Sequence, residues 1–274
     1  MQFTTVNSTL VVSKYTCFSE GPVVQRVIAV ANQKGGVGKT TTTINVGALL
    51  AKSGKNVLLV DLDPQANLTS GIGLNKNLDK TVQDVLFDAQ EVRSAIVETE
   101  FDNLSVIPAR PELATSEVDL VNELAREQRL KQALAMTEFD YVLIDCPPAL
   151  GLLTVNALTA ADDVLIPVQA EYFAMEGLGQ LLQTVQRIRQ ALNPELNLLG
   201  VLLTMYDNRT TLSAEVKNEI SQHLPGKVFS AIIPRNVRLA EAPSHGKPIN
   251  EHDRWSKGAK AYKHLVKELE KSLK

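Results

Sequence analysis

Residues 32–42, with the sequence NQKGGVGKTTT, constrain the fold of this chain more than any other stretch. They follow an apolar, β-branched run at 27–31 and precede a segment at 43–52 whose apolar residues have helical spacing. A strand, a glycine-rich turn and a helix, in that order, are the context that a phosphate-binding loop requires. The glycines let backbone N–H groups converge on one anion, and the helix N-terminus adds positive dipole.

The loop departs from the usual pattern G-x-x-x-x-G-K-[ST]. Gln33 stands in place of the first glycine, and Lys34 is a second lysine inside the loop. Lys39 is expected to reach the β- and γ-phosphates, and the hydroxyl of Thr40 to ligate Mg²⁺. The alternative, a turn that only caps a helix, requires strand, loop and helix to coincide by chance. The residues assigned to the nucleotide are Gln33, Lys34, Gly35, Gly36, Val37, Gly38, Lys39, Thr40 and Thr41.

The composition is that of a soluble globular protein, with 44% hydrophobic and 22% charged residues among 274. An apolar run long enough to cross a membrane is missing, and so is a secretory signal pattern. The two cysteines, Cys17 and Cys146, have neither a disulfide framework nor metal-ligand spacing, and Cys146 is read as a small buried apolar side chain. These features predict a cytoplasmic protein.

The net charge of −3 is unevenly distributed along the chain. Residues 205–274 carry 13 Lys and Arg against 8 Asp and Glu, whereas the preceding residues carry 15 against 23. A basic C-terminal quarter permits binding of a polyanion at one face. The alternative is a set of solvated helix faces, which composition alone favours.

Strand-like and helical segments alternate after a polar, weakly patterned extension at 1–25. The strands are mostly continuous apolar runs, which is typical of a parallel sheet with both faces covered. We therefore predict a single α/β domain over 26–274, with a doubly wound, mostly parallel sheet, helices on both faces and the P-loop NTPase type of fold. The expected strands are 27–31, 56–63, 104–108, 141–145, 164–168, 198–204 and 228–234. The expected helices between them include 111–136, 152–160, 175–192 and 213–223.

Ligands of such a sheet bind at the carboxyl ends of its strands, so the residues after each strand are read as one site. Asp61 and Asp63 end the second strand, and we expect one to hold magnesium through water while the other orients an attacking water. Asp145 ends the apolar strand VLID, the form of a Walker B element beside Mg²⁺. The metal ligands predicted are thus Thr40, Asp61 and Asp145. Other residues at this edge are Pro108, Gln169, Glu171, 206–209 and 234–238.

Four motifs in order resemble the ParA/Soj-type partition ATPases, the deviant Walker A branch that also contains MinD. They are KGGVGKTT at 34–41, VDLDPQ at 60–65, IDCPP at 144–148 and IPRNVRL at 233–239. The resemblance runs from about residue 27 to the C-terminus and leaves the extension at 1–25 outside it.

The resemblance implies roles for individual residues. Lys34 matches the extra lysine that contacts the nucleotide of the partner subunit in a sandwich dimer. Asp63 matches the carboxylate that positions the hydrolytic water, so the catalytic set is Lys34, Lys39 and Asp63. Pro234 and Asn236 match positions that hold the adenine, and Arg209 and Arg238 resemble arginines that bind DNA without sequence preference.

The function that the resemblance implies is a weak Mg-dependent ATPase that dimerises with ATP. The dimer would bind nucleoid DNA, and a ParB-like centromere-binding partner would stimulate hydrolysis. The cargo could be a chromosome, a plasmid or another large body.

Three other classes are compatible with the loop. One is a metabolic P-loop ligase, which no substrate motif in this sequence supports. A MinD-like positioning ATPase needs a terminal amphipathic helix that enters lipid, and the stretch at 258–274 has one apolar side but lacks Phe and Trp. A redox ATPase with an iron–sulfur cluster needs two well-placed cysteines from each subunit, which this chain lacks.

Overall fold

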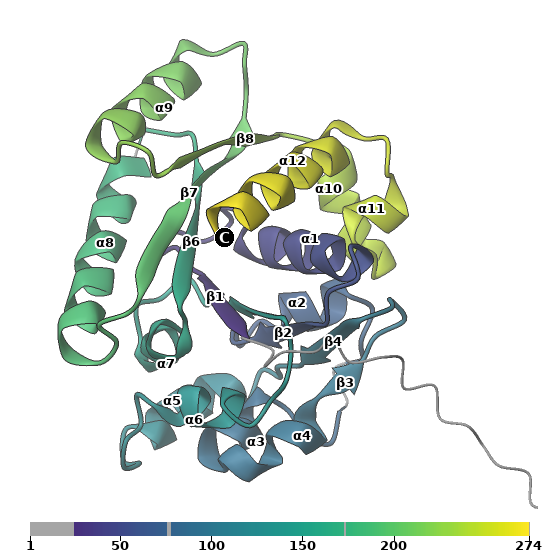
Figure 1. The fold of residues 1–274 in the computed structure, drawn as a ribbon, viewed down its shortest axis with the longest axis vertical. Helices are drawn as coiled ribbons and strands as arrows, with labels where there is room; N and C mark the ends of the chain where they lie inside the picture. Colours follow the sequence, from purple (N-terminus) through teal and green to yellow (C-terminus); the bar gives the residue numbers. More distant parts are fainter. Residues whose placement is uncertain (1–24, 76–77, 173, 274) are drawn as a thin grey trace, which may run out of the picture.

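A computed structural model describes residues 25–75, 78–172 and 174–273. An eight-stranded sheet runs through its centre in the order β3-β4-β2-β5-β1-β6-β7-β8, and every pairing is parallel except that of β3 with β4 (Figure 1). The strands are β1 (Arg26–Val30), β2 (Val57–Asp61), β3 (Val97–Glu98), β4 (Leu104–Ile107), β5 (Tyr141–Asp145), β6 (Asp163–Gln169), β7 (Asn197–Tyr206) and β8 (Val228–Pro234). The predicted doubly wound, mostly parallel sheet is confirmed.

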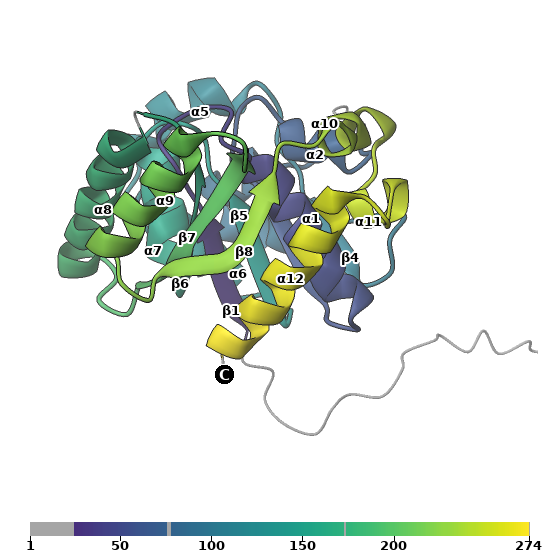
Figure 2. The same ribbon diagram turned by 90° about the horizontal axis from the view of Figure 1, so that it is seen from above.

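Helices cover both faces of the sheet, as Figures 1 and 2 show. On one face pack α1 (Lys39–Lys52), α2 (Asn67–Gly71), α10 (Val237–Glu241), η2 (Ala242–His245), α11 (Ile249–His252) and α12 (Lys257–Ser272). On the other face pack α3 (Val82–Phe87), η1 (Ala89–Glu91), α4 (Val92–Ala95), α5 (Leu113–Leu120), α6 (Arg129–Leu134), α7 (Leu152–Ala160), α8 (Ala174–Ala191) and α9 (Thr211–His223). Among the described residues, every helix is too short or too polar to span a bilayer.

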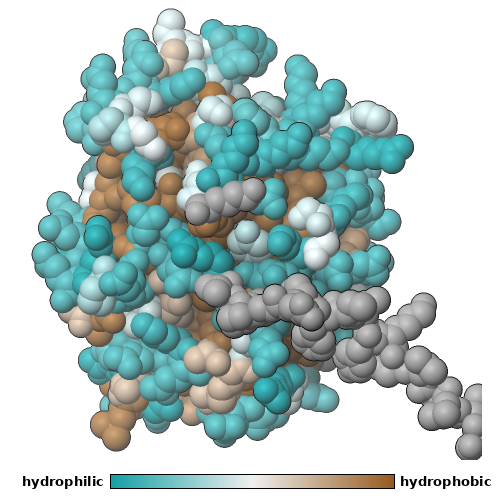
Figure 3. Space-filling view, in the orientation of Figure 1, coloured by the Kyte–Doolittle hydropathy of each residue, from teal (hydrophilic) through white to brown (hydrophobic). Residues whose placement is uncertain are grey.

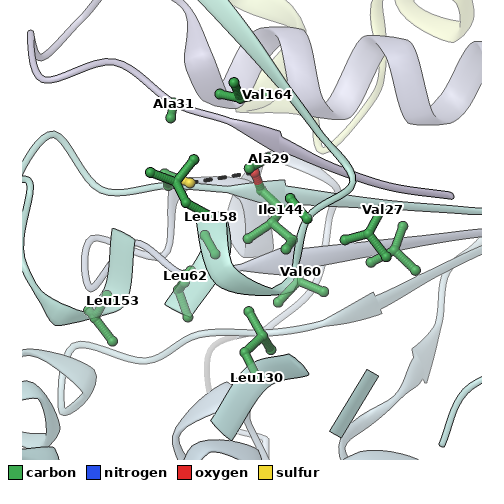
Figure 4. Close-up of a cluster of buried hydrophobic side chains, with 14 of the residues drawn as sticks. Val27, Ala29, Ala31, Val60, Leu62, Leu130, Ile144, Leu153, Leu158 and Val164 are labelled. Atoms are coloured by element: carbon green, nitrogen blue, oxygen red, sulfur yellow. Dashed lines mark hydrogen bonds between the residues drawn. The ribbon is translucent and has the colours of Figure 1, made fainter. Parts of the chain in front are cut away.

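The core consists of two hydrophobic clusters, one on each face of the sheet. Alternate residues of β1 point into different clusters, with Ile28 on the side of α1 and α12 and Ala29 on the side of α6 and α7. Figure 4 shows the cluster on the side of α6 and α7, in which Val60 and Ile144 of neighbouring strands face Leu130 of α6. Double coverage explains why the strands lack a polar alternation.

All seven predicted strands are present, but two predictions about helices were wrong. The helix expected over 111–136 is two short helices, α5 and α6, because the chain turns between them and Ala125 has φ 51°. Arginine side chains stabilise this turn: Arg126 Nη1 and Arg129 Nε donate to the carbonyl oxygens of Val121 and Leu124, the second at 3.2 Å. The first helix begins at Lys39, inside the loop, rather than at 43.

The predicted extension lies almost entirely outside the described residues. Gln25 is the exception, and its side chain is tied to the domain. Its Oε1 accepts hydrogen bonds from Thr137 Oγ1 at 3.0 Å and from Phe139 N at 3.2 Å.

Candidate nucleotide-binding site

The glycine-rich loop follows β1 and ends at the first residue of α1. Gly36 and Gly38 have φ of 74° and 89°, in the left-handed region that side chains with a Cβ avoid. Neighbouring strands hold the loop, since Thr204 Oγ1 of β7 donates to the carbonyl of Val37 at 2.8 Å and Asn32 Nδ2 donates to the carbonyl of Pro167 at 2.6 Å. These bonds fix the shape of the loop, and within it Lys34 N donates to Asn32 Oδ1 at 2.9 Å. A glycine-rich turn at the start of a helix can present backbone N–H groups to an anion.

Lys39 is a buried cation, and no carboxylate of the described residues forms a hydrogen bond or ion pair with it. Its Nζ donates to the carbonyl oxygen of Lys34 at 3.2 Å. Burial lowers the pKa of Lys39, and the negative charges of Asp145 and Asp63 only partly oppose this. A phosphate beside the ammonium would add to the partial counter-charge of Asp145 and Asp63.

Asp145 and Thr40, two of the predicted metal ligands, bring their side-chain oxygens together beside the loop. Thr40 Oγ1 donates to Asp145 Oδ2 at 2.6 Å, and the carboxylate is fully buried. Burial raises the pKa of Asp145 well above its usual range, and the charge of Asp61 raises it further. Among the described residues, no group of three or more His, Cys, Asp or Glu side chains could hold a metal alone. The pair fits Mg²⁺, which takes one or two protein oxygens and completes its shell with phosphate and water.

Asp61 and Asp63 have different environments. Asp61 accepts hydrogen bonds from Thr69 N at 2.9 Å, Thr69 Oγ1 at 2.7 Å and Asp63 N at 3.2 Å. Burial is the main cause that raises its pKa to about 6. These bonds make Asp61 an organiser of the segment that carries Asp63, and its assignment to the metal stays a prediction.

Asp63 lies at the edge of a cavity beside the glycine-rich loop, which we call the phosphate cavity after the role predicted for the loop. Its Oδ1 accepts from Gln65 N at 2.9 Å, which fixes the carboxylate, and no described residue donates a hydrogen bond to Oδ2. The cavity has a volume of about 250 Å³, and Asp63 faces it together with Lys39, Thr40 and the loop glycines. Oδ2 is thus available to a water molecule in this cavity.

A second cavity of about 210 Å³ adjoins the first, since Gly38, Thr41 and Met205 line both. Pro234 and Asn236, the residues assigned to the adenine, form part of its wall, and that assignment stays a prediction. Its other lining residues include Ile233, Arg235, Leu239, Ala240 and Tyr262. A polar cavity at the loop that continues into a more apolar one matches the triphosphate and base of a nucleotide.

Gln33 and Lys34, the residues that depart from the usual loop, have distinct surroundings. The side-chain oxygen of Gln33 is buried, and the described residues give it no hydrogen-bond partner. Lys34 Nζ lies 2.7 Å from Glu171 Oε2, while Gln169 Nε2 donates to Glu171 Oε1. Lys34 is therefore held by Glu171 and is not among the described residues that line the cavity at the loop, and Gln33 has an acceptor to offer a ligand.

Comparison with known proteins identifies the family. Residues 25–198 match the family model described as an AAA domain. The chain is 54% identical over 247 residues to the sporulation initiation inhibitor protein Soj of Bacillus subtilis, covering 89% of this chain and 98% of Soj. It is 49% identical over 251 residues to the chromosome partitioning protein ParA of Myxococcus xanthus, covering 90% and 89%. The chain belongs to the ParA/Soj family.

A solved structure shares the fold of this ParA/Soj-family chain. The cobyrinic acid a,c-diamide synthase of Mycobacterium smegmatis, with a bound ATP analogue and magnesium, is 43% identical with a TM-score of 0.80. The alignment covers 91% of this chain and 96% of that one. The family and the P-loop fold expected from the motifs are confirmed.

The two candidate DNA-binding arginines of this ParA/Soj-family chain lie beyond neighbouring strands. Tyr206 of β7 pairs with Pro234 of β8, so the loop that carries Arg209 and the segment that leads into α10, which carries Arg238, leave the sheet side by side. The side chain of Arg209 is 88% exposed and forms two hydrogen bonds with Asp207, at 2.9 and 2.7 Å. These bonds hold the pKa of Asp207 well below its usual range. Exposed ion pairs contribute only about 0–1 kcal/mol, so a DNA phosphate can compete for the guanidinium.

Several residues that build the site were not assigned roles from the sequence. Thr204 anchors the loop, Thr69 holds Asp61, and Glu171 holds Lys34. Thr204 ends a predicted strand, so its position at the carboxyl edge was a usable signal. Thr69 gives no such signal, because α2 is too short to show a period.

Proposed function

We propose that this chain is a weak Mg-dependent ATPase that dimerises with ATP bound and binds DNA without sequence preference. In the cytoplasm it would act on the nucleoid and segregate a chromosome or plasmid with a ParB-like centromere-binding partner. The observation that carries the proposal is the contrast between the two loop lysines. Lys39 faces the phosphate cavity, whereas Lys34 reaches outward to Glu171, where a second subunit could present its nucleotide.

The residues of one subunit account for binding and for a slow hydrolysis. Loop N–H groups and the buried ammonium of Lys39 hold the phosphates, and the free Oδ2 of Asp63 orients a water toward the terminal phosphate. Thr40 and Asp145 would hold magnesium, which would supply positive charge to offset that of the phosphates. The trans contact of Lys34 exists only with nucleotide present, which makes dimerisation depend on ATP.

DNA binding is assigned to the basic surface that carries Arg209 and Arg238. Because phosphate contacts are shared by all sequences, such binding is sequence-independent and strongly salt-dependent. Similarity to Soj and ParA, together with the adjacent loops after β7 and β8, supports this assignment.

One set of variants tests the proposal. Asp63→Ala should keep ATP-dependent dimerisation and DNA binding but stop phosphate release, whereas Lys39→Ala should lose ATP binding, measured by calorimetry. Arg238→Glu should lose duplex binding and keep ATP binding. Loss of ATP binding in Asp63→Ala would refute its role, and unchanged DNA affinity in Arg238→Glu would refute the DNA surface.

The C-terminal helix gives less support to the MinD-like, membrane-associated function than to the proposed one. Tyr262, Leu265, Val266 and Leu269 of α12 are buried in the core, so this face is not presented to lipid. Flotation with anionic liposomes and ATP distinguishes the two functions, because ATP-dependent co-flotation would favour the membrane-associated ATPase.

A further inference from the structure

The segment between α11 and α12 presents the sole tryptophan of the chain to solvent. Trp255 is 71% exposed, and the guanidinium carbon of Arg254 lies 5.1 Å from the centre of its ring. Tryptophan is an amphipathic residue enriched at binding surfaces, where its large ring gains most from a partner. The cation–π contact orients both side chains toward the same patch of surface.

A role for Trp255 in stabilising α12 does not explain this placement. Ser256 is the N-cap, with its Oγ accepting from Ala259 N at 3.1 Å, so Trp255 stands where a hydrophobic staple residue would. The staple partner would be four residues after the cap, and that residue is the exposed Lys260. The indole therefore lacks an apolar partner within its own helix.

The backbone of Trp255 is nevertheless held firmly. Asp253 Oδ1 accepts from Trp255 N and from Ser256 N, both at 3.1 Å, and Ser256 Oγ donates to the Asp253 carbonyl at 2.9 Å. An exposed ring on a fixed turn loses little conformational entropy when it binds.

The same carboxylate connects this turn to the proposed DNA surface. Asp253 Oδ2 lies 3.8 Å from Arg238 Nε, which places α10 beside the turn. Val237, the neighbour of Arg238, is 72% exposed. We call Val237, Arg238, Arg254 and Trp255 the Trp255 surface. On the side drawn in Figure 3, the surface over α12 is mostly hydrophilic.

The charge around the Trp255 surface favours a polyanion. Residues 235–260 carry six Lys and Arg against three Asp and Glu. The three carboxylates are already engaged: Glu241 with Arg238 at 2.9 Å, Glu251 with Lys52 at 2.8 Å, and Asp253 in the turn. Within the described part of the chain, the exposed cations Lys247, Arg254 and Lys257 form no ion pair. An incoming phosphate would meet uncompensated positive charge.

We propose that Trp255 and Arg254 form a further contact to duplex DNA, continuous with that of Arg238. Arg254 pairs with a backbone phosphate, and the indole packs on a deoxyribose at the edge of a groove. Phosphate and sugar are common to every sequence, so the contact adds affinity without sequence preference. The inference rests on the proposed DNA-binding function and assigns two residues to that site.

The two residues should differ in their salt dependence. The slope of log K against log salt becomes shallower by about 0.9 for each phosphate that the protein no longer neutralises. Arg254→Ala should therefore flatten the slope, whereas Trp255→Ala should weaken binding by at least about fivefold with the slope unchanged, as expected for an aromatic contact. Trp255→Phe keeps a ring and should recover most of the affinity.

The experiment uses the full chain with ATP and Mg²⁺ and a fluorescently labelled duplex of mixed sequence, with anisotropy measured at several salt concentrations. Matched controls lie away from the surface: Arg93→Ala on α4, and Leu124→Ala, which removes another exposed apolar side chain. Both controls should bind like the wild type. With an unlabelled duplex, the emission of Trp255 reports the contact directly, and we expect it to change on binding.

Each other outcome is decisive. If the wild type binds the duplex but Trp255→Ala binds equally well and the emission is constant, the inference is wrong and the proposed function stands. If the wild type does not bind any duplex, the inference and the proposed DNA-binding function are both wrong. If the variants keep their DNA affinity but lose stimulation by a ParB-like partner, the surface belongs to that protein and the DNA contact is refuted.

Discussion

Two lysines five residues apart in one loop have different surroundings, and the difference sets their roles. Lys39 is buried and turned inward, so its charge is available to a phosphate of the same subunit. Lys34 is half-exposed and bound to Glu171, which lies 137 residues further along the chain. The loop and both lysines could be predicted from the sequence, but this pairing could not, because no local pattern links residues so far apart.

The ion pair of Lys34 with Glu171 should oppose the proposed dimer, since the ammonium must leave Glu171 to reach a partner's nucleotide. Glu171→Gln weakens that hold and should lower the ATP concentration at half-maximal dimerisation by up to about fivefold, as an exposed pair contributes about 0–1 kcal/mol. Analytical ultracentrifugation across an ATP titration measures the shift.

Glu176→Gln on α8 is the matched control, because this exposed carboxylate forms no ion pair with the described residues. Weaker dimerisation of Glu171→Gln would show instead that Glu171 supports the dimer.

At the scale of elements, strands were predictable because a doubly covered sheet needs continuous apolar runs, and these are visible in sequence. Short helices were not, since elements such as α2 and α4 span little more than one turn and cannot show a repeating pattern. One signal was available and unused: Thr81 and Asp84 form a capping box at the start of α3. The break between α5 and α6 depends on Arg126 and Arg129 binding carbonyl oxygens, which helical spacing does not reveal.

The contact of α12 with α10 leaves no room for a side chain at Gly258. A Cβ there would lie 2.6 Å from Leu239 Cγ, so Gly258→Ala must displace α10, which carries Arg238 and follows Asn236. Overpacking costs about 1–3 kcal/mol, more than the roughly 1 kcal/mol that alanine gains over glycine in a helix. We expect a net loss of stability in urea denaturation and weaker DNA binding.

Gly179→Ala on α8 is the control for this substitution, because nothing lies within 4 Å of the added Cβ. It should stabilise the protein by up to about 1 kcal/mol. Equal effects of the two substitutions would show that α10 and α12 are not closely packed in solution.

For the whole molecule, the carboxyl edge of the sheet concentrates buried negative charge. Asp61 and Asp145 are paired residues of β2 and β5, both fully buried, and both have a raised pKa. A buried acid with a raised pKa stabilises the folded state while it is protonated, and that stabilisation is lost as it ionises. The nucleotide-free protein therefore loses stability as this edge acquires charge.

Asp61→Asn tests this relation between charge and stability. Below the ordinary pKa of an aspartate, near 4, Asp61 is protonated in both folded and unfolded chains, so its contribution is fully present. As the pH rises toward the folded pKa of about 6, the unfolded chain ionises first, and the stability of the wild type falls relative to the asparagine variant. The relative loss should reach on the order of 3 kcal/mol and level off above pH 7.

Urea unfolding of both proteins in EDTA, from pH 4 to 8, measures this loss of stability. Parallel stability curves over that range would mean that Asp61 ionises normally in the folded protein, and a wild type that gains stability relative to the variant would reverse the sign of the argument.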